Sequence, residues 1–156
     1  MNESMTGIVF DTSVYISAIR RGDESILDLR RASRGPDGKS QPLWLSSVVL
    51  SELLVGASDK RSRNRLLDFE RQFAQANRVL VPAQSDWRLA GEVLSLIGQK
   101  HGYEQVGRAR MTNDALISMT VARTGFTVLT KNPDDFKKIA EFRSFNWEEF
   151  TRLAKC

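Results

Sequence analysis

The sequence is poor in the side chains that build most zinc sites and many nucleophilic sites, because its 156 residues include one cysteine and one histidine. The single cysteine, Cys156, excludes a disulfide framework and a cysteine-based zinc site, and it fits the reducing conditions of the cytoplasm. The single histidine, His101, excludes a multi-histidine zinc centre and argues against a serine–histidine triad. We therefore expect a cytoplasmic protein whose chemistry rests on other groups.

Long hydrophobic segments are also missing. The uninterrupted apolar runs are only a few residues long, whereas a membrane-spanning helix needs about 20. Residues 1–7 carry neither the cationic start nor the apolar core of a signal peptide, so we expect no membrane partner. The chain contains no P-loop and no Gly-x-Ser-x-Gly motif, and Asp11-Thr12-Ser13 lacks the second aspartate of a phospho-aspartyl phosphatase.

What the sequence does contain is the composition of a folded domain, with 41% hydrophobic and 27% charged residues. Its length predicts a single domain over residues 1–156. The net charge is +4, and arginine and lysine gather in residues 20–34 and 60–65. These two segments either offer a polyanion several phosphate contacts or are solvated helix faces.

Short apolar strands alternate with helical segments along the chain. Strands are predicted at residues 7–10, 43–45, 79–81, 127–129 and 142–145. Helices are predicted from residue 12, around 26–30, at 48–56, 60–76, 86–100 and 112–124, from 133, and from 147. This alternation favours an α/β fold with three layers, α/β/α, around a mostly parallel central sheet.

Two loops and one amphipathic helix complete this prediction. Residues 34–42 are rich in glycine and proline and predict an exposed loop, and a polar loop is predicted to end at Met111. The helix at 60–76 is expected to carry Leu66, Leu67, Phe69 and Phe73 on its apolar side.

Four acidic residues fall where the carboxyl ends of the predicted strands meet, which is where ligands bind in an open parallel sheet. Asp11 directly follows the first strand, and Asp135 lies a few residues past the fourth. Asp114 is expected in the first turn of its helix, and Glu52 lies within an apolar helical stripe. Each has a simpler explanation: Asp11 as a helix N-cap, Asp114 and Asp135 as first-turn helix carboxylates, and Glu52 at a helix edge that reaches water.

Taken together, these four carboxylates predict a metal site. Such a cluster repels itself and is costly unless a hard divalent cation neutralises it. Ligands that offer only oxygen favour Mg²⁺ or Mn²⁺ over zinc. The sequence therefore predicts a divalent-cation site at the carboxyl edge of the sheet.

The acids lie in four segments: Val9-Phe10-Asp11-Thr12-Ser13-Val14, Ser47-Val48-Val49-Leu50-Ser51-Glu52-Leu53, Asn113-Asp114-Ala115-Leu116-Ile117 and Thr130-Lys131-Asn132-Pro133-Asp134-Asp135-Phe136. In order and spacing these segments resemble the four motifs of PIN domains, and most closely those of VapC-type ribonuclease toxins of bacterial toxin–antitoxin pairs. The resemblance covers nearly the whole chain, although the loop at 34–42 is long for a compact member of the family.

The resemblance implies a Mg²⁺-dependent endoribonuclease that hydrolyses RNA phosphodiester bonds, with Asp11, Glu52, Asp114 and Asp135 as catalytic metal ligands. Asp134 competes with Asp135 for the fourth position, and we favour Asp135 because it directly precedes Phe136, as in the Asp-Phe ending of the family motif. A small antitoxin that blocks the site and a homodimer are further implications of the resemblance.

One alternative belongs to a different class of function. A non-catalytic PIN-like module would bind RNA through its basic helices without cleaving it. The intact set of four acids argues against this, because a protein that only binds polyanions gains nothing from clustered negative charge. Arg108 and Arg110, shortly before Asp114, either contact the scissile strand or lie in a solvated loop.

Overall fold

A five-stranded sheet in which every pairing is parallel forms the centre of the protein, and this confirms the expected fold class. The computed structural model describes residues 6–28, 33–34 and 40–150. The strand order is β5-β4-β1-β6-β7. In chain order these strands are β1 (Ile8–Phe10), β4 (Leu43–Ser46), β5 (Val79–Leu80), β6 (Thr127–Thr130) and β7 (Asn146–Glu149).

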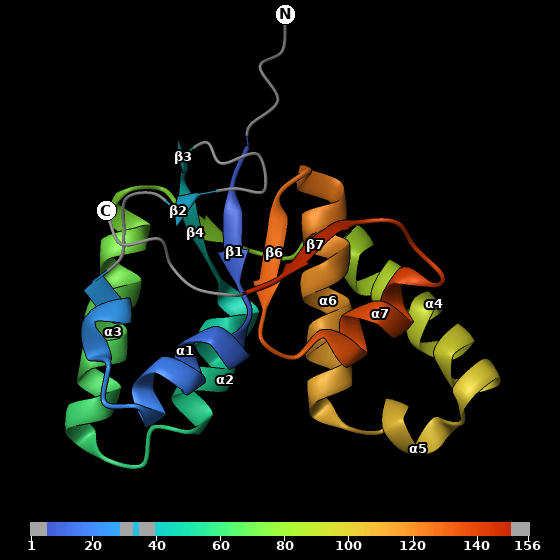
Figure 1. Ribbon diagram of the computed structural model, residues 1–156, viewed down its shortest axis with the longest axis horizontal. Helices are drawn as coiled ribbons and strands as arrows, with labels where there is room; N and C mark the ends of the chain where they lie inside the picture. Colours follow the sequence, from blue (N-terminus) through green and yellow to red (C-terminus); the bar gives the residue numbers. More distant parts are fainter. Residues whose placement is uncertain (1–5, 29–32, 35–39, 151–156) are drawn as a thin grey trace, which may run out of the picture.

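Helices cover both faces of the sheet, so that α1 to α3 lie on one side in Figure 1 and α4, α6 and α7 on the other. Every residue of β1 and β6 is buried, as expected for parallel strands between two helical layers. No helix in the described residues is long and apolar enough to cross a membrane. The helices are α1 (Thr12–Arg20), α2 (Ser47–Val55), α3 (Lys60–Gln75), α4 (Gln84–His101), α5 (Tyr103–Val106), α6 (Ala109–Thr124) and α7 (Pro133–Ala140).

Aromatic side chains join α3 to the sheet. The ring of Tyr15 packs edge-on against both Phe10 and Phe69, with centroid distances of 5.7 and 5.5 Å. Phe69 continues the contact to Phe73, and Leu66 is buried beside them. Of the four residues expected on the apolar side of α3, Leu66, Phe69 and Phe73 are buried and Leu67 is 38% exposed.

The structure corrects several predicted boundaries in the first part of the chain. The helix expected around residues 26–30 is a 3₁₀ helix, η1 (Glu24–Asp28), and residues 29–30 lie outside the described residues. The expected loop at 34–42 contains an antiparallel pair, β2 (Ser33–Arg34) with β3 (Ser40–Gln41).

Two further corrections concern the second half. The helix expected from Thr112 begins at Ala109, and the short α5 occupies part of the loop expected before it. The last strand is not residues 142–145 but β7, which contains Trp147, so no helix begins there. The polar sequence of β7 explains the error, because three of its four residues are exposed and an edge strand next to β6 needs few apolar residues.

The chain leaves β1 and β6 in opposite directions across the sheet. From β1 it passes through α1 towards β4, whereas from β6 it passes through α7 towards β7 on the other side. The carboxyl ends of these two adjacent strands therefore form a topological switch point, where doubly wound folds open a crevice for ligands.

Candidate active site

Asp11 lies at this switch point. The register that pairs Phe10 with Leu129 brings Asp11 beside Thr130, the last residue of β6. The backbone N–H of Asp11 donates to the Leu129 carbonyl at 2.9 Å, so its position is fixed by the sheet. Only 3% of Asp11 is exposed.

Two hydroxyls orient the Asp11 carboxylate. Ser13 Oγ and Thr130 Oγ1 donate to Asp11 Oδ2 at 2.8 and 2.9 Å. Asp11 occupies the N-cap position of α1, but its side chain makes no capping hydrogen bond with the helix backbone. The simpler explanation of Asp11 as a capping side chain is therefore wrong, and the carboxylate is directed towards the crevice residues instead.

Glu52 reaches the same crevice from α2, whose first turn is capped by the Ser46 hydroxyl. Thr12 Oγ1 donates to Glu52 Oε1 at 2.9 Å, which connects α2 to the start of α1. Burial raises the pKa of Glu52 above its usual 4.5, and the charge of Asp11 adds to the rise, while hydrogen bonds from Thr12 and Asn113 oppose it. Glu52 is therefore half-buried within the cluster and does not simply extend into water.

Asp114 is a buried acid whose pKa is strongly raised. Because α6 begins at Ala109, Asp114 lies in the second turn and not in the first turn, where a carboxylate would complement the helix dipole. Burial raises the pKa of Asp114 from 3.8 to about 10. The charge of Asp11, a side-chain hydrogen bond with Asp135 and the charges of Asp135 and Glu52 all act in the same direction. At neutral pH this carboxyl holds its proton unless a cation compensates the cluster.

Asp135 and Asp134 both lie in the first turn of α7, but their side chains differ in environment. Asp135 is half-buried and shares a hydrogen bond with Asp114, whereas Asp134 is exposed. Of the two adjacent acids, it is thus Asp135 that the fold brings to the cluster.

The acids border a cleft of about 600 Å³ that also has cations on its walls. Of the four acids, Asp11, Glu52 and Asp114 line it. The cations are Arg20 and Arg21 at the end of α1, Arg110 in the first turn of α6, and Lys131 directly after β6. Lys131 was not singled out from the sequence, although its position next to Thr130 within the fourth motif was an available signal.

The donor chemistry of the cluster fits a hard divalent cation. All four groups offer oxygen, and burial together with the charges of the neighbouring acids raises the pKa of Asp114. Among the described residues, no group of three or more acidic, histidine or cysteine side chains is arranged so that it could hold a metal ion. The hydroxyls of Ser13, Thr130 and Thr12 instead occupy oxygens of Asp11 and Glu52.

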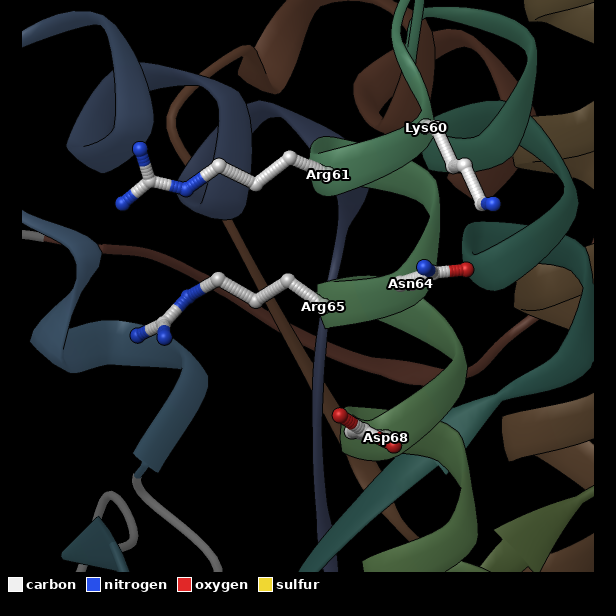
Figure 2. A pocket seen from close by; sticks show the side chains of 5 residues that line it. All are labelled: Lys60, Arg61, Asn64, Arg65 and Asp68. Carbon is white, nitrogen blue, oxygen red and sulfur yellow. The ribbon is translucent and has the colours of Figure 1, made fainter.

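The second basic segment lies apart from the cleft, on α3. Its residues line a separate depression of about 570 Å³ that shares no lining residue with the cleft: Lys60, Arg61, Asn64, Arg65 and Asp68. Figure 2 shows the side chains of Arg61 and Arg65 extended on the same side of α3. In the first basic segment, Arg30 and Arg31 lie outside the described residues.

Comparison with solved structures shows the same fold in three bacterial complexes. A chain of the DNA-bound VapBC from Salmonella typhimurium is 21% identical with a TM-score of 0.61, and the match covers 93% of this chain and 98% of that one. VapBC2 from Rickettsia felis, bound to a fragment of its promoter DNA, matches with 21% identity, 93% and 99% coverage and a TM-score of 0.60. VapBC-5 from Mycobacterium tuberculosis, a member of the VapBC family of toxin–antitoxin systems, matches with 24% identity, 93% and 97% coverage and a TM-score of 0.50.

Comparison of the sequence with known proteins and with models of protein families identifies the family. None of the curated proteins compared with the chain matches it. Residues 8–142, however, match the family model of the PIN domain, whose members are generally nucleases that use divalent metal ions. The matched region contains all four acids and every strand of the sheet except β7. With most of its length matched and the acids gathered at the switch point of a parallel sheet, the chain belongs to the PIN domain family.

Proposed function

We propose that this protein is a Mg²⁺-dependent endoribonuclease that hydrolyses RNA phosphodiester bonds, with Mn²⁺ as a possible substitute. The observation that carries the proposal is Asp114, a buried carboxyl whose pKa is raised to about 10 by burial and by three neighbouring acids. A buried carboxyl with a strongly raised pKa is unfavourable for the stability of the fold, so its presence at a cleft indicates a functional role. Binding of a hard cation is the role that fits the oxygen donors. The choice of RNA rests on the resemblance to VapC-type toxins.

The four acids have separate roles in this proposal. Asp11 and Asp114 are assigned to direct metal ligation, because short side chains on a sheet end and a helix hold an octahedral ion well. Glu52, on a longer side chain, either ligates the ion or orients the attacking water, and Asp135 holds a second ion or its water shell. When bound, Mg²⁺ supplies an activated water and stabilises the charge that develops on the phosphate. Ser13, Thr130 and Thr12 keep Asp11 and Glu52 in place.

The biological setting is proposed from the same resemblance and from the solved structures of similar fold. Those structures are VapBC complexes, and one of them is described as a toxin–antitoxin system. We therefore propose that the chain is the toxin of a type II pair, acts in the cytoplasm as one nuclease domain and a homodimer, and is inhibited by a small cognate antitoxin.

The decisive experiment is digestion of a set of structured RNAs by the purified protein, with Mg²⁺, with Mn²⁺ and with EDTA, followed by mapping of the cut sites. We expect discrete cuts that require the metal. In parallel, Mg²⁺ should raise the melting temperature, because binding to the folded state alone is stabilising. RNA binding without cleavage and without a response to Mg²⁺ would instead establish the non-catalytic module.

A further inference from the structure

Arg110 is one of the four cations that line the cleft, none of which has a role in the four-acid proposal. It lies in the first turn of α6, four residues before Asp114, so the two side chains project from the same face of the helix. Arg110 lines the cleft together with Asp11, Glu52 and Asp114, whereas its neighbour Arg108 does not.

The guanidinium of Arg110 is held in place without being neutralised. With the Asn132 amide turned so that its oxygen faces the guanidinium, that oxygen accepts from Arg110 Nη1 at 3.0 Å and also from Nη2. The Asn132 backbone N–H in turn donates to Thr130 Oγ1 at 3.0 Å, which ties this support to the Asp11 network. No salt bridge joins Arg110 to an acid anywhere in the described residues, and its charge reaches Glu52 only over a longer distance.

Two of the three other cations that line the cleft are already engaged, and the third, Arg20, lies at the end of α1. Lys131 Nζ donates to Ser17 Oγ at 3.0 Å and lies 5.7 Å from the ring centroid of Phe150. Arg21 donates from Nη1 to the same Ser17 hydroxyl at 3.0 Å. Arg110 is exposed, has donors left over and, unlike Arg20, projects from the helix that carries Asp114, so it is the better candidate for contact with a ligand beside the acids.

We propose that Arg110 binds a phosphate of the RNA strand and draws it into the cleft beside the carboxylate cluster; this inference rests on the proposed nuclease function. A phosphate that approaches four clustered acids is repelled, and a fixed cation at the rim offsets that repulsion. The guanidinium adds geometry, because its paired N–H groups match two oxygens of a phosphate. Asn132 is then a positioning residue that acts through Arg110.

A structural role for Arg110 makes different predictions. If Arg110 only balances the charge of the acids, its removal should lower the stability of the metal-free protein and leave RNA affinity unchanged. If it binds substrate, its removal should weaken RNA binding, while the metal-free melting temperature moves little because the side chain is exposed.

The test uses Arg110→Gln, Arg110→Lys and the control Arg108→Gln, which removes the same charge two residues away and outside the cleft. For each variant, kcat and KM for a mapped RNA are measured in Mg²⁺. The affinity for a labelled single-stranded oligoribonucleotide is measured in EDTA at several salt concentrations. Melting temperatures of the metal-free proteins complete the set.

We expect Arg110→Gln to raise KM and weaken oligoribonucleotide binding roughly tenfold to a hundredfold, as for the loss of a charge-assisted hydrogen bond, with a smaller effect on kcat. The salt dependence of binding should flatten by about one phosphate contact. Arg110→Lys should keep the salt dependence but recover only part of the affinity, because it keeps the charge and loses the paired donors. Arg108→Gln should behave like the parent.

Two results would overturn the inference. One is parental KM and RNA affinity in Arg110→Gln, and the other is an equal loss in Arg110→Gln and Arg108→Gln, which would indicate only diffuse charge. Failure of the proposed nuclease function gives a different result. In that case the parent protein cleaves no RNA in Mg²⁺, whether or not Arg110→Gln weakens RNA binding in EDTA.

Discussion

The cleft and the basic face of α3 are both rich in charge, but they hold that charge in opposite ways. In the cleft, Asp11 and Asp114 are each 3% exposed, and hydroxyls or another carboxyl serve as their hydrogen-bond partners. On α3, whose side chains Figure 2 shows, Lys60 and Arg61 are exposed. Arg65 contacts Glu24 and Asp28 at 3.4 and 3.9 Å.

The two regions differ in how much their charges lower the stability of the fold. Solvated cations and surface ion pairs contribute about 0–1 kcal/mol each and need no functional explanation. Buried acids that repel one another lower the stability of the metal-free fold and persist where a ligand later compensates them. On this ground we propose the cleft as the site of the chemistry and give α3 at most a supporting part in binding.

The largest effect is expected for Asp114→Asn, which keeps the volume and removes an ionisable carboxyl from the cleft. Cleavage of a mapped RNA and affinity for Mg²⁺ should collapse, because a hard cation loses a charged ligand. The metal-free protein should become more stable by about 1 kcal/mol or more at pH 7, since the side chain no longer has to take up a proton to fold. Digestion assays, Mg²⁺ titration and denaturation in EDTA measure the three quantities.

Near-parental, Mg²⁺-dependent cleavage by Asp114→Asn would falsify the assignment of the cleft as the catalytic centre. A large fall in metal-free stability would contradict the view that this charge opposes folding. Asp134→Asn is the matched control, because it makes the same change on an exposed acid near the site and should leave cleavage and stability close to those of the parent.

The second prediction concerns pH. Asp114 ionises near 3.8 when the chain is unfolded and near 10 in the folded protein, so between these values the folded state holds an extra proton. The free energy of unfolding in EDTA should therefore be highest at low pH and fall as pH rises through this window, by at most about 1.4 kcal/mol per unit from this group. Urea unfolding from pH 5 to pH 9 measures the slope, and Asp114→Asn should flatten it. Parallel slopes in the two proteins would show that Asp114 is not the group responsible.

Mg²⁺ should reverse this trend. Binding of a cation to the cluster displaces the proton of Asp114, so Mg²⁺ affinity should increase with pH and each binding event should release protons to the buffer. Calorimetric titration in two buffers of different ionisation enthalpy detects that release. Titrations that are identical in the two buffers would contradict the protonated state of Asp114.

A smaller effect is expected from the hydroxyl that orients Asp11. Thr130→Val keeps the shape of a fully buried side chain and removes the donor to Asp11 and the acceptor for the Asn132 N–H. We expect a loss of about 1–3 kcal/mol in stability from the unpaired groups and about a tenfold fall in cleavage. Thr120→Val is the control, because Thr120 is equally buried and bonds only the Leu116 carbonyl of its own helix. An equal loss of cleavage in both variants would indicate general destabilisation.

The layers of the fold were predictable because strand–helix alternation is strong in this chain. The apolar runs at β1, β4 and β6 are fully or nearly buried, and such runs are hard to mistake. The errors fall where tertiary contact decides the structure. The strand β7 exists because β6 offers it a pairing edge, although Trp147-Glu148-Glu149 has no strand pattern of its own. The start of α6 was placed late because Arg108 is not a typical capping residue.

The acids of the candidate site were predictable as a set, because each follows or faces the end of a parallel strand. Carboxylates placed together at such a sheet edge favour a cation as ligand. Their partners were less accessible to sequence reasoning. That Asp11 bonds two hydroxyls and not the helix backbone depends on the β1–β6 register, which joins residues far apart in the chain. The ion pair of Arg65 with Glu24 likewise depends on how η1 packs on α3. It gives Arg65 a different environment from that of Lys60 and Arg61, which are exposed.

The last and smallest prediction tests whether α3 supports RNA binding at all. A sequence-based test would replace Arg61, Arg63 and Arg65 together, but Arg65 is engaged with η1, so the structure favours separate variants. Lys60→Gln with Arg61→Gln should weaken oligoribonucleotide binding a few-fold, equally for any sequence, and flatten its salt dependence. Arg65→Gln should leave binding nearly unchanged and reduce stability by about 0.5 kcal/mol, as for other surface ion pairs.

Binding measured across salt concentrations and urea unfolding distinguish these effects. Parental affinity and salt dependence in the double variant would assign the α3 face to solvent or to a protein partner, and would leave the cleft as the sole RNA contact among the regions compared.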